Sequence, residues 1–543
     1  MHHTVHAVFC ATAARTPEAD FLFTESVTAQ AYGIAPGALR WGDAATQVER
    51  LRVAYAAAGY GHGHRVGLLL ENRPAFLLHW LALNALGVSV VPINADMRSA
   101  ELSYLIGHSE IALAVTLPER ADDLMAAARL AGVGAFATMT ADDVDAIPTA
   151  STAAPRAAEP IGRDTECGLL YTSGTTGRPK GCILSNAYYL WSGEWYAALD
   201  GVCSVRPDSE RVITPLPLTH MNAMACSTMV VLVAGGCLVQ LDRFHPKTWL
   251  QSARESGATI AHYLGVMPAM LLSAPPSPAD RDHAIRWGFG AGVDRKHHAV
   301  FEARFGFPLV EAWAMTETGV AACIMANREP RLVGTSCFGR QADFLELRLV
   351  DEAGADVFAD APGELLVRSA GTDPRRHFFS GYLKDAEATD EAWAGGWFHT
   401  GDLVRRDTDG NFFFVDRKKN VIRRSGENIS AVEVESVLNQ HPAVKTSAVA
   451  ATPDAVRGDE VLACVVLRED ADTASPAETA ASIVAHALAQ LAYYKAPGYV
   501  AFVDALPLTP SQKIQRGQLR EMAHALPGQP HCIDTRAMKK RQG

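Results

Sequence analysis

The stretch LLYTSGTTGRPKGCILSN, residues 169–186, combines three glycines with many hydroxyl side chains and two cations. Glycine tolerates the positive-φ turns that point successive backbone N–H groups at an anion. A polar surface turn is the alternative, but the density of hydroxyls between the glycines favours a phosphate-binding loop. The stretch is not a G-x-x-x-x-G-K-[ST] P-loop, because Pro179 separates Arg178 from Lys180 and Gly181 follows. The residues that we expect around the phosphates are Thr172, Ser173, Gly174, Thr175, Thr176, Gly177 and Lys180.

The composition indicates a globular protein with a sizeable core. A chain of 543 residues suggests two to four domains, and 48% of the residues are hydrophobic against 20% charged. The net charge of −11 argues against nucleic acid as the main partner. The ten cysteines contain no C-x-x-C pair, so we expect free thiols in a reducing compartment rather than disulfides or a zinc site.

The chain shows no sign of export or of a membrane span. Residues 1–17 lack the basic start and long apolar core of a secretory signal. The longest apolar run, residues 229–239, is too short to cross a bilayer and is expected to be a buried element. These features predict a cytoplasmic protein.

The N-terminal part alternates helix and strand patterns. Residues 41–59 carry apolar side chains at helical spacing and end at a glycine. Residues 65–72 and 87–94 are short apolar runs that predict buried parallel strands, with residues 74–87 as the helix between them. Residues 140–164 are rich in Ala, Pro, Thr and Asp and are expected to form an exposed connection. This alternation predicts layered α/β structure.

The pattern changes after about residue 334. Short strands separated by turn residues, at 345–354, 363–369 and 410–417, predict a small β-rich subdomain. Further on, helix patterns at 431–444 and 478–491 alternate with strands, which predicts a compact α+β domain. The fold class is therefore α/β, with a large N-terminal domain of several subdomains and a small C-terminal one.

Five further segments, spread over the rest of the chain, extend the pattern of the opening loop. They are PLTHMNAM from Pro217, EAWAMTETG from Glu311, WFHTGD ending at Asp402, VDRKKNVI from Val415, and PLTPSQKIQR with Lys513. In this order they resemble the adenylate-forming superfamily, which includes acyl-CoA synthetases, luciferases and peptide-synthetase adenylation domains. The overall pattern and the SGENIS loop are most similar to the crotonobetaine/carnitine-CoA ligase branch.

The resemblance implies an AMP-binding domain over residues 1–418 and a mobile lid over residues 419–543 that carries the catalytic lysine. It also implies an ATP-dependent acyl-CoA ligase. A carboxylic acid would react with ATP to give an acyl adenylate and pyrophosphate, and the acyl group would then pass to coenzyme A. ATP, Mg²⁺ and coenzyme A are the implied cofactors and co-substrates. A homodimer is left open.

The resemblance assigns roles to individual residues. Lys513 would place a positive charge between the carboxylate and the α-phosphate, and Glu317 would bind Mg²⁺ as a hard oxygen ligand. The implied catalytic set is Lys513, His220, Thr316 and Glu317. Besides the loop, the implied ATP-binding residues are Ala312, Trp313, Thr316, Asp402, Arg417 and Lys513. Taken singly, a helix-capping threonine, a solvated glutamate and a surface lysine are the commoner interpretations of such residues.

The second half-reaction requires room for the thiol, which the family is known to provide by rotating the lid. The hinge position corresponds to Lys419, and Arg423 and Gly426 would then line the thiol channel. A basic, solvated loop is the alternative interpretation of this segment.

The sequence departs from the family pattern at several positions. Trp313 stands where a tyrosine usually stacks on adenine, and its larger ring preserves stacking. Ala314 replaces the usual glycine at the wall of the acyl pocket and should shorten that pocket. Gln512 replaces a glycine beside Lys513, and Gly292 stands where proline is usual.

The acyl pocket implied by family position is small and partly polar, which predicts a short or medium, polar acid. Its expected residues are His220, Met221, Asn222, Tyr263, Gly265, Gly290, Ala291 and Ala314. A trimethylammonium group would require aromatic faces, and Tyr189, Trp191, Trp195 and Tyr196 could supply them, although aromatics at helical spacing are more often core residues.

Other functions remain open at this stage. The adenylate could pass to a carrier protein or another acceptor, or react with oxygen as in luciferases. A non-catalytic nucleotide-binding regulator is disfavoured, because binding alone does not require both Glu317 and Lys513.

Overall fold

The computed structural model describes residues 2–172, 178–293, 295–351, 353–417, 421–469, 475–507, 514 and 516–540. The chain forms two compact units. One contains Met1–Ala95, Ile106–Leu170 and Gly181–Asp416, and the other contains Asp96–Leu105, Tyr171–Lys180 and Arg417–Gly543. The predicted α/β fold class, with a large and a small part, is confirmed. No described helix is long and apolar enough to cross a membrane.

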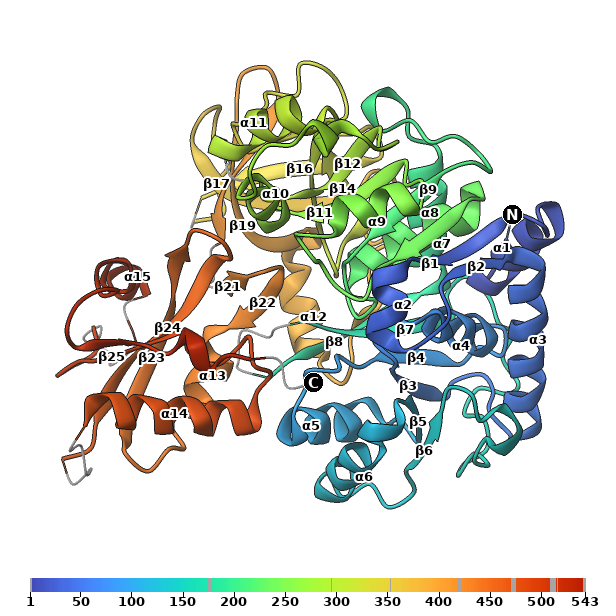
Figure 1. The fold of residues 1–543 in the computed structure, drawn as a ribbon, viewed down its shortest axis with the longest axis horizontal. Helices are drawn as coiled ribbons and strands as arrows, with labels where there is room; N and C mark the ends of the chain where they lie inside the picture. Colours follow the sequence, from blue (N-terminus) through green and yellow to red (C-terminus); the bar gives the residue numbers. More distant parts are fainter. Residues whose placement is uncertain are drawn as a thin grey trace. The chain divides into compact units, whose positions relative to one another are not determined.

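One sheet follows the predicted α/β alternation, with strand order β18-β8-β7-β4-β3-β5-β6. The parallel strands β3 and β4 are joined by α4, whose side chains from Phe76 to Asn84 are all buried. This burial arises because α4 packs against β4 and against α3 and α1 (Figure 1). The strands are β3 (Arg65–Leu69), β4 (Ser89–Pro92), β5 (Leu113–Thr116), β6 (Ala137–Thr140), β7 (Glu166–Thr172), β8 (Lys180–Ser185) and β18 (Gly381–Tyr382), and the helices are α1 (Val5–Arg15), α3 (Trp41–Ala57), α4 (Pro74–Asn84), α5 (Ser99–Ser109), α6 (Ala121–Leu130) and α12 (Ala386–Ala392).

A second sheet has the order β14-β13-β12-β11-β9-β10-β1-β2. Its central strands β13, β12, β11 and β9 are parallel neighbours, so their carboxyl ends lie at one edge. The strands are β1 (Asp20–Thr24), β2 (Gly37–Arg40), β9 (Arg211–Thr214), β10 (Cys237–Gln240), β11 (Ile260–Leu264), β12 (Trp287–Ala291), β13 (Leu309–Met315) and β14 (Gly319–Met325), and the helices are α2 (Ser26–Tyr32), α7 (Asn186–Ala197), α8 (Thr228–Ala234), α9 (Trp249–Glu255), α10 (Val266–Leu272) and α11 (Arg295–Phe305).

The predicted β-rich subdomain is present as an antiparallel sheet of order β15-β20-β19-β17-β16. Its strands are β15 (Cys337–Arg340), β16 (Leu345–Val350), β17 (Pro362–Ser369), β19 (Phe398–Arg406) and β20 (Asn411–Arg417).

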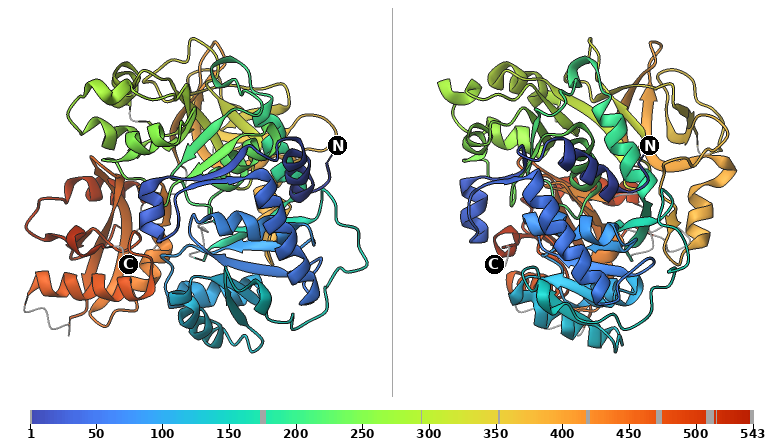
Figure 2. Two further views of the ribbon diagram at one scale, coloured as in Figure 1. Left: turned by 45° about the vertical axis from the view of Figure 1, so that its right-hand side comes forward. Right: turned by 90° about the vertical axis from the view of Figure 1, so that its right-hand side faces the viewer.

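The unit that contains the C-terminal part of the chain is built on a sheet of order β22-β21-β24-β25-β26, with β23 paired to β24. Side chains alternate along β24, so Val461, Ala463 and Val465 pack with α13 and α14. Leu462 and Cys464 pack on the other face with side chains of α15, and α14 and α15 lie on opposite sides of this sheet (Figures 1 and 2). The elements are β21 (Val421–Arg424), β22 (Glu427–Ser430), α13 (Ala431–Leu438), β23 (Val444–Asp454), β24 (Gly458–Leu467), α14 (Pro476–Gln490), β25 (Tyr499–Phe502), α15 (Arg516–Ala525) and β26 (Cys532–Asp534).

All ten cysteines are free thiols, and most of them are buried. Burial raises the pKa of the Cys226 thiol to about 12 and that of Cys237 to about 12. These thiols therefore act as small apolar side chains.

Candidate active site

Four predicted site residues of the large unit lie at the carboxyl edge of the second sheet. His220 follows β9, Gly265 follows β11, Ala291 ends β12 and Ala314 lies next to the last residue of β13. These four strands are consecutive parallel neighbours. Ligands of open α/β sheets bind at the carboxyl ends of the strands, so this edge is where a site is expected.

The loop that carries His220 is fixed by Asn72, which follows β3. The Asn72 side-chain amide donates to the carbonyl oxygens of Leu241 and Leu216 at 2.8 and 3.3 Å. Its Oδ1 accepts from the Leu218 N–H at 2.9 Å. Because this buried amide engages both sides of the loop, residues 215–218 have little freedom to move. Sequence analysis missed Asn72.

The turn with Thr316 and Glu317 is held between α7 and β14. The Tyr188 hydroxyl donates to the Thr316 carbonyl oxygen at 2.9 Å, and the Met315 N–H donates to Thr318 Oγ1 at 3.0 Å. Gly319 has a φ of 51°, and a Cβ there would lie 2.5 Å from the Tyr188 ring. A side chain at 319 is thus excluded, and the turn is locked onto Tyr188.

Glu317 is an oriented carboxylate with only 7% of its surface exposed. The Tyr382 hydroxyl donates to its Oε1 at 3.0 Å, and the Glu317 carbonyl oxygen accepts from the Phe379 N–H at 2.9 Å. Burial, followed by the neighbouring Glu317 charge, raises the Tyr382 pKa well above its usual value. The tyrosine is therefore a permanent donor, and it orients the Glu317 carboxyl group.

Trp313 and Asp402 are directly joined. The Trp313 ring N–H donates to Asp402 Oδ2 at 2.8 Å, and both residues are buried. The Asp402 N–H donates to Thr400 Oγ1 at 3.1 Å. Tyrosine has no ring N–H, so this bond depends on the departure from the family pattern at position 313. Ala312, on the same strand, is also buried.

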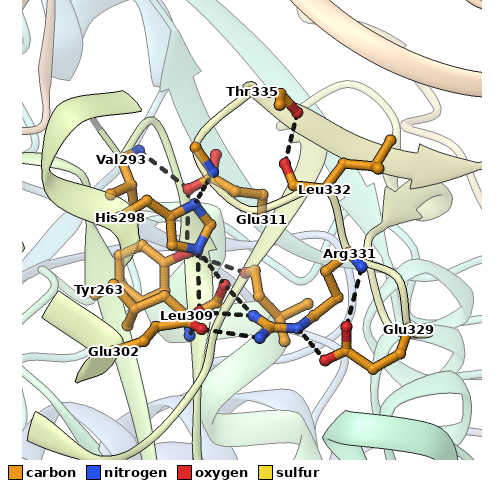
Figure 3. A network of polar contacts seen from close by, with 12 residues as sticks. Tyr263, Val293, His298, Glu302, Leu309, Glu311, Glu329, Arg331, Leu332 and Thr335 are labelled. Carbon is orange, nitrogen blue, oxygen red and sulfur yellow. Dashed lines mark hydrogen bonds and ion pairs between the residues drawn. The ribbon is translucent and has the colours of Figure 1, made fainter. Parts of the chain in front are cut away.

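Glu311 organises the loop after β12 (Figure 3). Its carboxylate accepts from the N–H groups of Gly292 and Val293 at 2.9 and 3.0 Å. The Tyr263 hydroxyl donates to Glu311 Oε1 at 3.2 Å. Burial raises the Glu311 pKa although these hydrogen bonds oppose the shift.

The same loop lies directly against β11. A Cβ at Gly265 would come within 1.7 Å of the Gly292 carbonyl oxygen, and one at Gly290 within 2.2 Å of the Tyr263 carbonyl oxygen. Both positions therefore require glycine. Tyr263 is 3% exposed, and its hydroxyl supports the loop through Glu311.

A charged cluster supports the start of β13 (Figure 3). Arg331 donates to both oxygens of Glu302 at 2.6 and 2.9 Å, and His298 Nε2 lies 2.9 Å from the Leu309 carbonyl oxygen. Burial opposes ionisation of Glu302, but the hydrogen bonds from Arg331 and His298 outweigh it and lower the Glu302 pKa to about 2. The cluster fixes the strand that leads to Trp313.

Comparison with known proteins places these features in one family. The family model described as AMP-binding enzyme matches residues 10–383, and the one described as AMP-binding enzyme C-terminal domain matches residues 433–513. The chain belongs to the AMP-binding enzyme family.

Its relatives match along nearly the whole chain. The sulfoacetate–CoA ligase of Cupriavidus necator is 32% identical over 527 residues, covering 96% of this chain and 98% of the relative. The crotonobetaine/carnitine–CoA ligase of Citrobacter koseri is 29% identical over 486 residues, covering 87% and 91%.

Solved structures show the same fold. The o-succinylbenzoate CoA synthetase of Bacillus subtilis has a TM-score of 0.78 at 23% identity, covering 95% of this chain and 98% of its own. The amide bond synthetase of Marinactinospora thermotolerans has a TM-score of 0.78 at 24% identity, covering 96% and 99%.

Several predicted residues lie outside the described part of this AMP-binding enzyme. The flanks of the phosphate loop are described: Thr172 ends β7 and Lys180 begins β8. Tyr104 supports the second flank, since its hydroxyl donates to the Pro179 carbonyl oxygen at 2.9 Å. The residues outside are Ser173, Gly174, Thr175, Thr176, Gly177, Lys419, Gln512 and Lys513, together with the side chain of Arg417.

The predicted thiol-channel residues lie on the hairpin formed by β21 and β22. Arg423 is exposed, and its N–H donates to Asp459 Oδ2 at 3.1 Å. Ser425 and Gly426 form the turn with positive φ values of 51° and 90°. A glycine at 426 suits this backbone, whereas Ser425 adopts a conformation that costs energy for most side chains.

Proposed function

We propose that this AMP-binding enzyme is an ATP-dependent acid–CoA ligase. The observation that carries the proposal is the match to curated CoA ligases along most of the chain, combined with the placement of His220, Gly265, Ala291 and Ala314 at the carboxyl ends of four neighbouring parallel strands. Transfer of the adenylate to a carrier protein or another acceptor is not favoured, because the curated relatives are CoA ligases. The likeness to an amide bond synthetase supports the fold alone.

In the first half-reaction, a carboxylate oxygen of the acid attacks the α-phosphorus of ATP. The bond from the α-phosphorus to the bridging oxygen breaks, and pyrophosphate leaves. Both reactants are anions, so cationic groups and N–H donors must offset the charge that builds on the phosphate oxygens. Lys513 and the loop Thr172–Lys180 supply them, and Thr316 donates a hydrogen bond to the α-phosphate.

Glu317 is the residue that would hold Mg²⁺. Its buried carboxylate, oriented by Tyr382, matches the oxygen ligands that this cation prefers. When bound, the cation would offset negative charge on the phosphate oxygens.

Asp402 and Trp313 bind the nucleoside together. Asp402 accepts hydrogen bonds from the ribose hydroxyls, with Arg417 as the second ribose ligand, and Trp313 stacks on the adenine beside Ala312. Because the Trp313 N–H is bonded to Asp402, the base platform and the ribose ligand keep a fixed relation.

In the second half-reaction, the thiol sulfur of coenzyme A attacks the adenylate carbonyl carbon. The carbonyl–phosphate oxygen bond breaks, AMP leaves, and the thiol proton passes to solvent. Lys419 is the hinge for the rotation of residues 419–543, and Arg423 and Gly426 line the thiol path.

The substrate is a short or medium, polar acid. His220, Met221, Asn222 and Ala314 line the pocket, and the Ala314 methyl group shortens it. The names of two relatives describe acids of this kind, sulfoacetate and crotonobetaine or carnitine.

An aromatic cage for trimethylammonium is not supported by the packing of α7. Tyr196 is fully buried and stacks on His262 and Trp287, with ring centroids 5.6 and 6.0 Å away. Trp191 stacks on His377 at 4.8 Å with an interplanar angle of 8°. Because these faces are already covered, they are not available to a cation.

The test mixes the protein with ATP, Mg²⁺, coenzyme A and a panel of carboxylic acids, and follows pyrophosphate and thioester separately. Acid-dependent formation of both products supports the proposal, and pyrophosphate without thioester contradicts it. The Lys513→Ala variant should lose adenylate formation by a large factor while still binding ATP, and equal loss of both would refute the role of Lys513.

A further inference from the structure

A buried polar chain lies beneath the turn that follows His220. Its members, which we call the His262 relay, are Tyr196, His262, Ser227 and Asn222. His262 Nδ1 lies 2.8 Å from Asn222 Oδ1 and 2.8 Å from Ser227 Oγ, and Nε2 lies 2.7 Å from the Tyr196 hydroxyl. The His262 side chain is completely buried.

With the Asn222 amide oxygen facing the ring, these contacts are consistent with one position of the imidazole proton. The amide oxygen of Asn222 can only accept, so the contact at 2.8 Å is a hydrogen bond only when His262 Nδ1 carries the proton. Burial lowers the His262 pKa to about 3, so the ring is neutral near pH 7. Nε2 therefore carries a lone pair, and the Tyr196 hydroxyl donates to it.

The relay fixes the orientation of the Asn222 amide. Its oxygen points inward to His262, so the NH₂ group diverges from the ring. Asn222 is partly exposed, and its Nδ2 donates to no residue that the structure describes. An amide held in this way offers donors and no acceptor to a bound molecule.

The local backbone supports the same conclusion. Asn222–Ser227 forms a π-helical turn, in which the Thr228 N–H donates to the Ala223 carbonyl oxygen five residues back. The Thr228 hydroxyl donates to the same oxygen at 2.8 Å. π-turns are rare and occur often at functional sites. This turn places Asn222 two residues after His220, at the carboxyl edge of the sheet.

We propose that Asn222 determines specificity by donating hydrogen bonds to an oxyanion, a sulfonate or a second carboxylate, at the end of the acid remote from the reacting carboxylate. The inference rests on the proposed ligase function and defines its substrate class. A trimethylammonium group has no acceptor and would meet the positive end of the Asn222 amide dipole. The relay opposes an outward turn of the amide oxygen, since the amide NH₂ group would then face His262 Nδ1–H, donor against donor, in a fully buried position.

The experiment compares wild type with Asn222→Leu, which keeps the size of the side chain but removes the donors. Each protein is assayed with sulfoacetate, malonate, propionate and glycine betaine by thioester formation. In wild type, one or both oxyanion acids should be the preferred substrates. Comparing sulfoacetate with malonate shows whether the bound oxyanion is a sulfonate or a second carboxylate. In the variant, kcat/KM for the oxyanion acids should fall roughly 10- to 100-fold, mainly through KM. Propionate, which makes no such bond, is the internal control: its kcat/KM should fall by a smaller factor, so that the ratio of oxyanion acid to propionate drops roughly 10-fold or more.

Other outcomes would overturn the inference. One is a wild-type preference for propionate or glycine betaine over both oxyanion acids. Another is an equal loss for every acid in the variant, which would indicate a structural role. If Asn222→Leu does not fold, Asn222→Ala provides the same comparison. Wild type that forms no thioester with any acid would instead refute the proposed ligase function.

Discussion

Two buried polar networks lie in the two compact units of the chain, and they differ in charge. The His262 relay is neutral, and each hydrogen of the ring and of the tyrosine has an acceptor. In the other unit, Arg424 donates to Glu460 at 2.8 and 2.9 Å, and Lys539 Nζ donates to the same carboxylate. These three side chains are 3%, 0% and 0% exposed.

The difference shows what each network is suited to do. Burying a neutral, fully paired chain of hydrogen bonds costs little free energy, and such a chain sets the direction of a polar group such as the Asn222 amide. A charged cluster loses hydration that only its own members replace, so removing one member is costly. The first network is therefore suited to selecting a substrate and the second to fixing a fold.

The charged cluster also gives a role to the tail of the chain. The C-terminal family model ends at residue 513, whereas Lys539 lies beyond β26. A Cβ at Gly498 would lie 2.5 Å from Glu460 Cδ, so only glycine fits beside the carboxylate. Lys539, beyond β26, therefore occupies a confined position beside Glu460.

The largest effect is expected for Glu460→Gln. The variant leaves Arg424, and Lys539 when it is protonated, in a dry interior without their carboxylate, and such losses cost about 3–5 kcal/mol. The midpoint of urea unfolding, followed by circular dichroism, measures the loss. Asp534→Asn is the matched control, because the Asp534–Arg536 pair is 50% and 44% exposed and such pairs contribute about 0–1 kcal/mol. Equal effects of the two variants would show that burial does not make the loss of the Glu460 charge more costly than that of an exposed pair.

Lys539 should make stability depend on pH. Burial, with further opposition from Arg424, lowers the Lys539 pKa to about 7 from 10.5, although Glu460 opposes the shift. Between these values the unfolded chain binds more protons than the folded one, so stability rises with pH across this window. Lys539→Met should lose that rise. Urea midpoints from pH 7 to 9.5 measure it, and parallel curves for wild type and variant would contradict the assignment.

Glu302→Gln tests a charged network in the large unit. If charge decides how much a network contributes to stability, losing this carboxylate should also be costly, although it lies in the same unit as the neutral relay. The folded Glu302 has a pKa of about 2 against 4.5 when free. Its stabilisation is therefore complete above pH 4.5 and is lost as the pH falls toward 2. A shift of this size corresponds to roughly 3 kcal/mol near neutral pH. The variant should lose that amount at pH 7. Its urea midpoint should also fall less steeply than that of wild type as the pH drops from 4.5 toward 2, and an equally steep fall would contradict the prediction.

The hydrogen bond between Trp313 and Asp402 shares features of both networks, because a neutral donor meets a charged acceptor. Trp313→Phe tests this bond. The variant removes the hydrogen bond to Asp402 and keeps an aromatic face for stacking. The bond also forms in the free protein, so ATP binding is weakened only through the lost orientation of Asp402 and the ring, and KM for ATP should rise roughly three- to tenfold. Pyrophosphate release at varied ATP measures this. A change in kcat alone would place the bond outside nucleotide binding.

Much of the fold could be predicted because its signals are local. The apolar runs at 65–72 and 87–94 and the helix between them correspond to β3, β4 and α4. The helix α1 was missed, since residues 1–17 were considered only as a signal peptide, and its apolar side chains become meaningful only once they pack against α3 and α4. The strand β26 was missed as well, because it is only three residues long.

The candidate site could be predicted only in part, for a similar reason. The motif residues at the strand ends were found by resemblance, but the groups that position them were not. Asn72 reaches Leu218 across 146 residues, Tyr188 reaches Thr316 across 128, and Tyr382 reaches Glu317 across 65. Such pairs leave no periodic pattern in the sequence, so they emerge only from the fold.

The smallest effect is expected for Tyr196→Phe, which tests the relay itself. The variant removes the donor to His262 Nε2 and leaves that lone pair buried, at a cost of about 1–3 kcal/mol in unfolding free energy. The imidazole proton should stay on Nδ1, because Asn222 and Ser227 still accept it and nothing at position 196 could accept a proton from Nε2. Asn222 should therefore keep its orientation, and the ratio of kcat/KM for malonate over propionate should remain within about twofold of wild type. If the ratio reverses while the unfolding midpoint barely moves, Tyr196 sets the tautomer, and the direction of the Asn222 amide is controlled from the far end of the relay.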